Sequence, residues 1–165
     1  MKKYELTAEF IEKWGKKLFR IKALISFGSV EVGELGGYVE KEDNLAQDGN
    51  AWVYGNAEVY GNAEVYGDAR VCGDAEVYGN ADYLLIGRIG SRFSFTTFFK
   101  NKDKGITVSC GCFLGTIAEF RAKVSDTHGN NKHAKIYNLA ADMAELQILG
   151  EEYFDKLNTN KSEPF

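Results

Sequence analysis

Polar and apolar positions repeat every six residues between Asn50 and Ala81. The segment reads NAWVYG, NAEVYG, NAEVYG, DARVCG, DAEVYG and NA. A helix repeats its buried face about every 3.6 residues, whereas a strand alternates every second residue, and six is a multiple of two. The Gly-Asn and Gly-Asp pairs favour a turn, because these residue types tolerate positive φ. The pattern therefore predicts a short strand and a corner in each six-residue unit.

Short strands joined by corners at a fixed period are typical of a parallel β-helix. The unit V-Y-G-N-A-E resembles the motif of the hexapeptide-repeat left-handed β-helix superfamily, in which three units form one triangular coil. Degenerate units extend the phase over residues 35–88, and the resemblance implies about three coils. It also implies that Tyr60 stacks over Tyr78, one coil later. The predicted fold is mainly β: a left-handed parallel β-helix with an N-terminal helix and a C-terminal α+β module.

The tyrosines of the repeat are predicted to point outward, because they alternate with the inward-facing valines. A row of exposed aromatic side chains indicates an interface more often than bare surface. Members of the superfamily are commonly homotrimers, so the resemblance implies a trimer. The predicted interface residues are Tyr54, Tyr60, Tyr66 and Tyr78. The alternative is that the terminal segments of the same chain cover these side chains.

Residues 1–34 are predicted to cap one end of the repeat. A helix is expected at Thr7–Leu18, because Phe10, Ile11 and Trp14 fall at helical spacing. A strand is expected to follow at Leu18–Phe27. The helix would cover edge groups that the first coil leaves unpaired.

Residues 89–157 are predicted to form the α+β module, a hairpin followed by two helices, and residues 158–165 a polar tail. The turn NKDKG separates the two strands of the hairpin. The first helix is expected from Thr116, with Glu119 completing a capping box. Gly150 is expected to interrupt the second helix.

Composition limits the class of protein. The chain has 165 residues, a formal net charge of −4 and three cysteines. The mild acidity argues against generic nucleic-acid binding, and no apolar run is long enough to cross a bilayer. The segment MKKYELTAEF lacks the apolar centre of a signal peptide, and an odd number of cysteines favours a reducing compartment. We therefore expect a cytoplasmic protein that binds no membrane.

Acyl transfer is the first candidate chemistry, because it is the commonest enzymatic use of the superfamily. Such enzymes resemble one another in a histidine on the coils that deprotonates the acceptor. The only histidines here, His128 and His133, lie outside the repeat. An acyltransferase-like enzyme that uses one of them across a subunit boundary is therefore the alternative hypothesis rather than the first.

A metal site is the second candidate. Two residues apart in a strand, Cys110 and Cys112 share a face, and His128 and His133 follow. Two Cys and two His suit zinc, but the spacing is not that of a common zinc motif. The alternative is two small buried thiols and two histidines at helix ends. We expect no cofactor.

An anion or nucleotide pocket is the third candidate. The segment GRIGSR offers arginines, a serine and flexible backbone, and arginine forks and backbone N–H groups bind phosphate well. The glycine spacing is not a dinucleotide fingerprint. The candidate ligand-binding residues are Arg88, Ser91, Arg92, Thr96, Thr97, Thr127, His128, Asn131 and His133. The alternative is a solvated hairpin and helix cap.

A closer resemblance covers most of the chain, from about Phe27 to Leu146. The runs DNLAQDGNAWVYGNAEVYGNA, IGRIGSRFSFTTFF, VSCGCFLGTIAEF and THGNNKHA resemble a phage- and prophage-borne family whose members carry variable numbers of these units before the same C-terminal module. Its members are often labelled putative transferase or polymer-forming cytoskeletal protein, and the resemblance implies no established activity.

The function hypothesis combines the missing coil histidine with the donor-rich C-terminal module. We expect a non-enzymatic phage accessory protein that acts as a trimeric binding platform in the cytoplasm of the bacterial host. It would inhibit an anti-phage defence system, either by binding a host protein or by sequestering a phosphate-bearing, nucleotide-like signal molecule. This step is an analogy with phage proteins of similar size.

Overall fold

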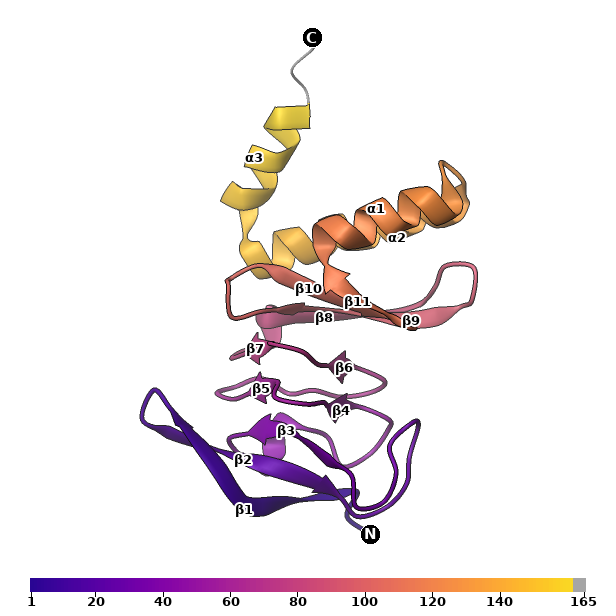
Figure 1. Cartoon of the computed structure of the whole chain (residues 1–165). Helices are drawn as coiled ribbons and strands as arrows, with labels where there is room; N and C mark the ends of the chain where they lie inside the picture. Colours follow the sequence, from indigo (N-terminus) through magenta and orange to yellow (C-terminus); the bar gives the residue numbers. More distant parts are fainter. Residues whose placement is uncertain (162–165) are drawn as a thin grey trace.

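The computed structural model describes residues 1–161 as an elongated stack of layers (Figure 1). An N-terminal hairpin lies at one end, the six-residue repeat forms the middle, and a four-stranded sheet covered by helices forms the other end. The strands are β1 (Tyr4–Lys13), β2 (Lys16–Ala23), β3 (Leu35–Val39), β4 (Trp52–Val53), β5 (Glu58–Val59), β6 (Arg70–Val71), β7 (Glu76–Val77), β8 (Tyr83–Ile89), β9 (Ser94–Lys100), β10 (Ile106–Cys110) and β11 (Phe113–Thr116). The helices are the short η1 (Glu42–Asn44) and η2 (Asn80–Asp82), then α1 (Ile117–His128), α2 (Lys132–Leu149) and α3 (Glu151–Lys161).

The predicted left-handed parallel β-helix is wrong. The fold is mixed α/β, with three separate sheets in the orders β1-β2-β3-β5-β7, β4-β6 and β11-β10-β9-β8, and no sheet in the described residues closes or forms a solenoid. The repeat strands are only two residues long and divide between two of these sheets. On the remaining side of the repeat, Leu45 and Val65 form a single isolated bridge. The repeat therefore lacks the three continuous sheets of the predicted architecture. Its strands have two residues each, and on one side of the repeat the pairing is a single bridge.

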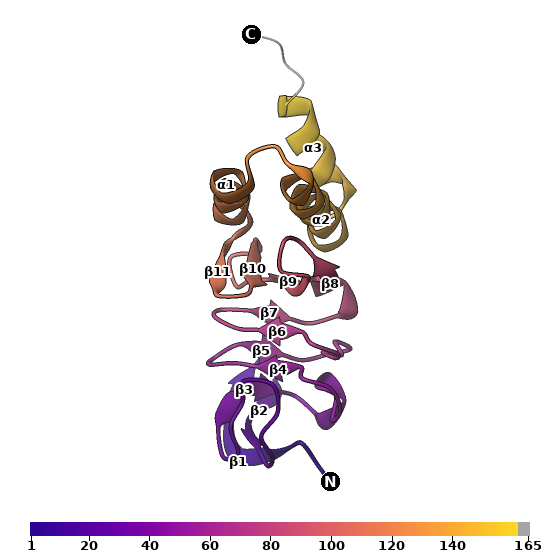
Figure 2. The same ribbon diagram turned by 90° about the vertical axis from the view of Figure 1, so that its right-hand side faces the viewer.

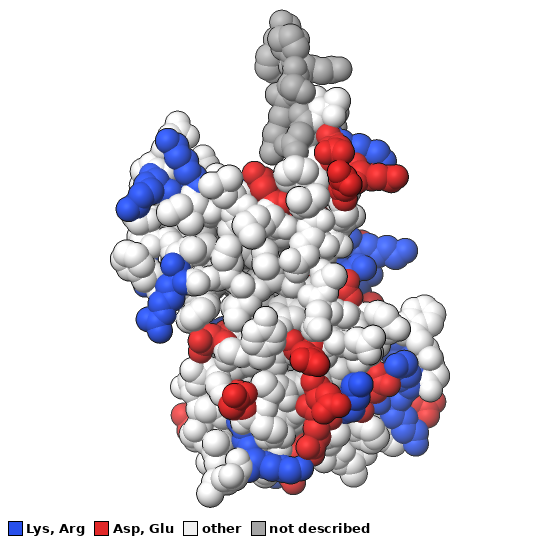
Figure 3. Space-filling model, turned by 180° about the vertical axis from the view of Figure 1, so that it is seen from behind, with Lys and Arg blue, Asp and Glu red and all other residues white. Residues whose placement is uncertain are grey.

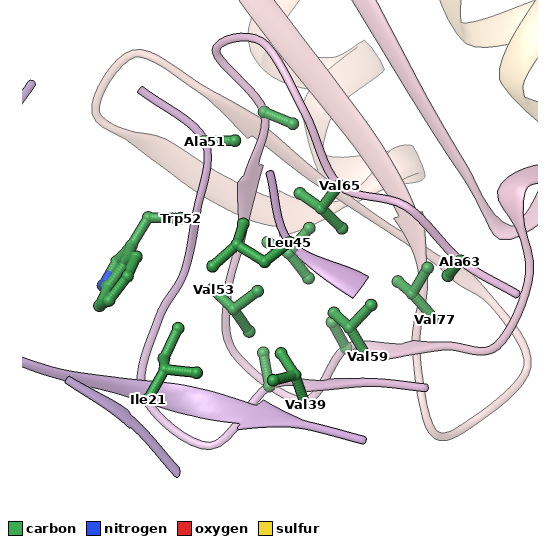
Figure 4. Packing of buried hydrophobic residues seen from close by; sticks show 14 of the residues in the cluster. Ile21, Val39, Leu45, Ala51, Trp52, Val53, Val59, Ala63, Val65 and Val77 are labelled. Carbon is green, nitrogen blue, oxygen red and sulfur yellow. The ribbon is translucent and has the colours of Figure 1, made fainter. Parts of the chain in front are cut away.

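Parallel pairing within the repeat joins residues three units apart. Val53 pairs with Val71 and Val59 with Val77. The predicted position of Tyr60 over Tyr78 is confirmed, since their ring centres lie 5.3 Å apart, although the rings meet edge to face and do not stack. The valines of the repeat are all fully buried in one core, and Figure 4 shows four of them, Val53, Val59, Val65 and Val77, around Leu45. Valine suits this position because its branched side chain packs well on a short extended segment.

The predicted helix at Thr7–Leu18 is also wrong, since β1 and β2 form an antiparallel hairpin there. Trp14 and Gly15 make the turn at φ 52° and 74°. The apolar residues that suggested a helix instead pair across the hairpin, Ile11 with Leu18 and Phe10 with Phe19.

Ion pairs hold this hairpin on the repeat. Lys13 pairs with both Glu58 and Glu76, and Lys16 with Glu40 at 2.8 Å. The hydrogen bond from Lys16 and one from the Gly61 backbone N–H lower the pKa of Glu40. The hairpin therefore covers the side of the repeat that carries β3, β5 and β7.

The helices of the C-terminal module follow the sequence signals. The hydroxyl of Thr116 accepts from the backbone N–H of Glu119, so the predicted capping box is confirmed. Gly150, at φ 89°, separates α2 from α3, as expected. Helices α1 and α2 lie on one side of the four-stranded sheet and the repeat lies on the other (Figure 2). Of the tail predicted at 158–165, residues 158–161 belong to α3, and the rest lies outside the described residues.

Lys3 gives the fold a measurable pH dependence. Only 2 % of this residue is exposed, its ammonium donates to the Ala51 carbonyl at 2.9 Å, and burial lowers its pKa to about 8, against the opposing effect of Asp48. Above this value the folded chain releases a proton that the unfolded chain keeps up to its ordinary pKa of 10.5. The free energy of unfolding should therefore rise with pH from about 8 to 10. Above that range, the raised pKa values of Tyr4 and Tyr83 act in the opposite direction.

Urea unfolding at several pH values between about 7 and 10 measures this dependence. The Lys3→Met variant should lack the contribution of Lys3, so the difference in unfolding free energy between wild type and variant should grow with pH. Parallel curves for the two proteins would contradict the assignment.

Candidate functional site

The predicted ligand-binding residues are divided between the two faces of the four-stranded sheet. Neighbours along β9 point to opposite faces, because side chains of a strand alternate. Phe98 packs with the helices, and Phe99 packs with the repeat. In the same way, Thr96 donates a hydrogen bond to Cys110 on the helix side, whereas Thr97 accepts one from the backbone of Arg70 on the repeat side.

The helix side holds a recess of about 100 Å³. Its lining includes Thr127 and His128 from α1, Tyr137 from α2 and Cys110 from β10. The rings of His128 and Tyr137 stack at 5.8 Å. Burial, together with Cys110, raises the pKa of Tyr137, whereas the nearby Arg92 lowers it. The recess is small and mostly apolar, so it offers little room for a ligand larger than a few atoms.

The other predicted residues of this module lie around the recess. Ser91 and Arg92 are exposed in the turn between β8 and β9. Asn131 caps α2, since its side-chain oxygen accepts from the backbone of His133 at 2.9 Å. The rings of His133 and His128 lie 5.7 Å apart. His128, Asn131 and His133 are therefore near one another, but the side chain of Asn131 is already used by the helix.

The weak metal candidates do not converge on one point. Cys110 ends β10, whereas Cys112 is exposed in the turn that follows it. Within residues 1–161, no three His, Cys, Asp or Glu side chains are close enough together to hold a metal ion. Cys110 instead accepts a hydrogen bond from Thr96 at 3.2 Å.

The repeat side of the sheet holds a larger cleft, with a volume of about 280 Å³. It lies where the repeat, the segment after β2 and the β9–β10 pair meet. We call it the repeat–sheet cleft. Its lining residues are Gly28, Ser29, Asn50, Tyr54, Asp68, Arg70, Ser94, Phe95, Thr97, Ser109 and Gly111. Hydroxyl, amide, carboxylate and guanidinium groups therefore surround a space large enough for a small organic molecule.

Arg70 forms the basic part of the cleft. Its guanidinium lies 5.0 Å from the centre of the Tyr54 ring, and among residues 1–161 it makes no hydrogen bond or ion pair. The backbone N–H of Arg70 is fixed by Thr97 at 3.1 Å, so its position in the cleft wall is set. A second arginine, Arg88, lies 5.6 Å from the ring of Phe95, which lines the same cleft. Arg70 lines the cleft, whereas Arg88 does not, so within residues 1–161 the guanidinium of Arg70 is the one whose N–H donors face a ligand there.

Polar contacts also order the rest of the cleft wall. The hydroxyls of Ser29 and Tyr54 lie 3.3 Å apart, and Asn50 donates to the carboxylate of Asp68 at 2.9 Å.

Cys72 lies behind the wall. Its pKa is raised by burial, while a hydrogen bond with Ser109 and the charge of Arg70 act in the opposite direction. The thiol is partly buried, and its contact with Ser109 joins the repeat to β10 at the wall of the cleft.

Two irregular positions in the repeat indicate this cleft in the sequence, but the regularity of the other units drew attention away from them. The unit DARVCG departs from the repeat at two positions. Arg70 stands where Glu58, Glu64 and Glu76 stand in other units, and Cys72 stands where they have tyrosine. Both exceptions lie at the cleft, since one lines it and the other supports it.

The four tyrosines predicted at a subunit interface have different environments. Tyr60 is buried beneath the hairpin with Leu18, and Tyr54 lines the repeat–sheet cleft. Tyr66 and Tyr78 are 59 % and 55 % exposed. A tyrosine interface therefore stays a prediction, with Tyr66 and Tyr78 as the accessible members.

The chain matches no protein-family profile, and a comparison with curated proteins finds no significant match. None of the helices within residues 1–161 is long and apolar enough to cross a membrane. The geometry is therefore the guide to chemistry: the repeat–sheet cleft combines anion donors with aromatic surfaces, an arrangement that suits a planar or cyclic molecule carrying negative charge.

Proposed function

We propose that the protein is a non-enzymatic binding protein that holds a phosphate-bearing, nucleotide-like small molecule in the repeat–sheet cleft. The observation that supports this proposal is the Arg70 guanidinium, which lines the cleft without an ion-pair partner among residues 1–161. A guanidinium fork stacked on an aromatic ring is oriented to donate two parallel hydrogen bonds to a phosphate.

The remaining groups suit the other parts of a nucleotide. Phe95 offers a ring face on which a base can stack. Asp68 accepts hydrogen bonds and can take them from sugar hydroxyls, while Ser94 can donate to a phosphate oxygen. The volume of about 280 Å³ suits one nucleotide better than a long polymer.

Binding rather than acyl transfer is proposed because neither His128 nor His133 lines this cleft. A general base must reach the proton that it removes, directly or through one water. The resemblance to phage-borne proteins is the reason to place this binding in an infected bacterial cell. Sequestration of a phosphate-bearing signal molecule would there weaken a defence system that depends on it.

Isothermal titration with AMP, adenosine and inorganic phosphate tests the proposal. AMP should bind more tightly than adenosine, because only AMP carries a phosphate that the guanidinium of Arg70 can bind. The Arg70→Glu variant, which restores the residue type found at this position in other units, should weaken AMP binding at least about tenfold.

Arg92→Ala is the matched control, because Arg92 lies in the β8–β9 turn, near Tyr137 on the helix side. It should bind AMP like the wild type. Loss of binding in Arg92→Ala but not in Arg70→Glu would move the site to the helix-side recess. If neither AMP nor inorganic phosphate binds, the proposal of a phosphate site is wrong.

A further inference from the structure

Helix α2 presents an apolar stripe to solvent. Leu139, Met143 and Leu146 are 63 %, 53 % and 45 % exposed, and their spacing of four and then three residues puts them on one face. The opposite face, with Ala141 and Ala144, is fully buried against the sheet and α1. The fold of a single chain therefore does not need the stripe, and a row of exposed apolar side chains on one helix marks a contact surface.

The stripe runs between ends of opposite charge. Lys132 and Lys135 are exposed at its start, and Glu151 and Glu152 are exposed just after its end. None of these four side chains forms an ion pair within residues 1–161. Figure 3 shows the same distribution, with a mostly uncharged face between basic side chains on one side and acidic side chains beside the base of α3.

We propose that this stripe is the contact surface for a second copy of the chain, with the two α2 helices packed antiparallel about a two-fold axis near Met143. Leu139 of each copy then meets Leu146 of the other. The lysines at the start of each α2 then face the glutamates that follow the end of α2 in the other copy. A parallel arrangement would instead bring the lysines of the two copies together. The helix dipoles also favour the antiparallel arrangement. A two-fold contact uses the same surface on both copies, and the charges at the two ends of this stripe are complementary to each other.

A groove beside the stripe adds contact area. It has a volume of about 470 Å³ and lies along Leu139, Lys135 and Asn138, at the start of α2. In the antiparallel pair, this end of one copy lies opposite the start of α3 in the other, where Tyr153 is 45 % exposed. An aromatic side chain set in a groove is a typical anchor of an interface. The repeat–sheet cleft lies on the other side of the four-stranded sheet, so the pair leaves it open.

Sedimentation velocity of the full chain over a range of concentrations tests this contact. The wild type should form a dimer. Met143→Glu should raise the dissociation constant at least about tenfold, because it places two carboxylates together at the axis. Leu114→Glu is the matched control, since Leu114 is 51 % exposed on β11 and outside the stripe, and it should dimerise like the wild type. Circular dichroism checks that both variants fold.

Charge reversal tests the antiparallel direction separately. Lys135→Glu alone should weaken the dimer, and adding Glu151→Lys in the same chain should restore it, because each end then again meets the opposite charge. A monomer at all concentrations, a trimer, or a dimer unaffected by Met143→Glu would overturn the proposal. A double variant as weak as the Lys135→Glu variant would overturn the antiparallel arrangement.

Discussion

Replacing Gly37 by Ala should destabilise the protein by roughly 3 kcal/mol. Gly37 is buried in β3, where that strand meets the first turn of the repeat. A Cβ atom at this position would overlap the carbonyl oxygen of Ala57 and would lie 2.7 Å from a methyl group of Val53. The carbonyl belongs to backbone that hydrogen-bonds with Tyr38, so it cannot rotate away. The added methyl group must therefore separate β3 from β5.

Gly79→Ala is the matched control, because it adds the same methyl group to the same protein. Gly79 has extended backbone at φ −137°, and a Cβ atom there meets nothing within 4 Å. This variant should be neutral or more stable by about 0.5 kcal/mol, since alanine restricts the unfolded chain. Urea unfolding followed by circular dichroism compares the two variants. Equal stability of Gly37→Ala and Gly79→Ala would show that the close approach at Gly37 has no energetic role.

Local sequence patterns predicted the interior of the repeat but not the arrangement of its sheets. Valine in every unit, followed by turn residues, was enough to place these valines in the core, and the three-unit period implied by the resemblance placed Tyr60 against Tyr78. Whether the units close into one solenoid depends on hydrogen bonds between segments, which six-residue periodicity does not contain. Here one side of the repeat has only the bridge between Leu45 and Val65. On another side, the sheet formed by β3, β5 and β7 continues into the antiparallel hairpin of β1 and β2.

The N-terminal hairpin shows how spacing alone can mislead. Residues at intervals of three and four suggest a helix, but the same residues can pair across a turn. The decisive feature is a turn at Trp14 and Gly15, both with positive φ. Tryptophan is an uncommon residue for that conformation, so turn chemistry gave little sign of it. The hairpin is selected by its contacts with the repeat, including the ion pairs of Lys13.

The candidate site was predicted only in part because it is built from distant segments. Thr97 was chosen as a donor, but its partner Arg70 lies in the repeat. Sequence alternation along β9 could have separated Thr96 from Thr97, since neighbours in a strand face opposite sides. It could not indicate that Ser29 would meet Tyr54 at the other wall of the cleft. The sequence signal for this site is therefore the pair of exceptions in one unit of the repeat, Arg70 and Cys72.

Replacing Arg121 by Met should cost about 3 to 5 kcal/mol of stability. Arg121 of α1 forms ion pairs of 2.7 Å with Asp142 and Glu145 of α2 and a 3.1 Å hydrogen bond to Asn138. The side chain of Glu145 is only 7 % exposed. Without Arg121, its carboxylate would stay buried with no counter-ion, and that uncompensated charge accounts for most of the cost.

A double-mutant cycle separates this effect from simple loss of packing. Arg121→Met with Glu145→Met removes both charges and keeps similar volumes, so it should recover most of the stability that Arg121→Met loses. Asp142→Asn is the milder control, because the side chain of Asp142 is 37 % exposed and remains hydrated, and it should cost less than about 1 kcal/mol. A double variant as unstable as Arg121→Met would mean that α1 and α2 depend on the arginine stem rather than on its charge.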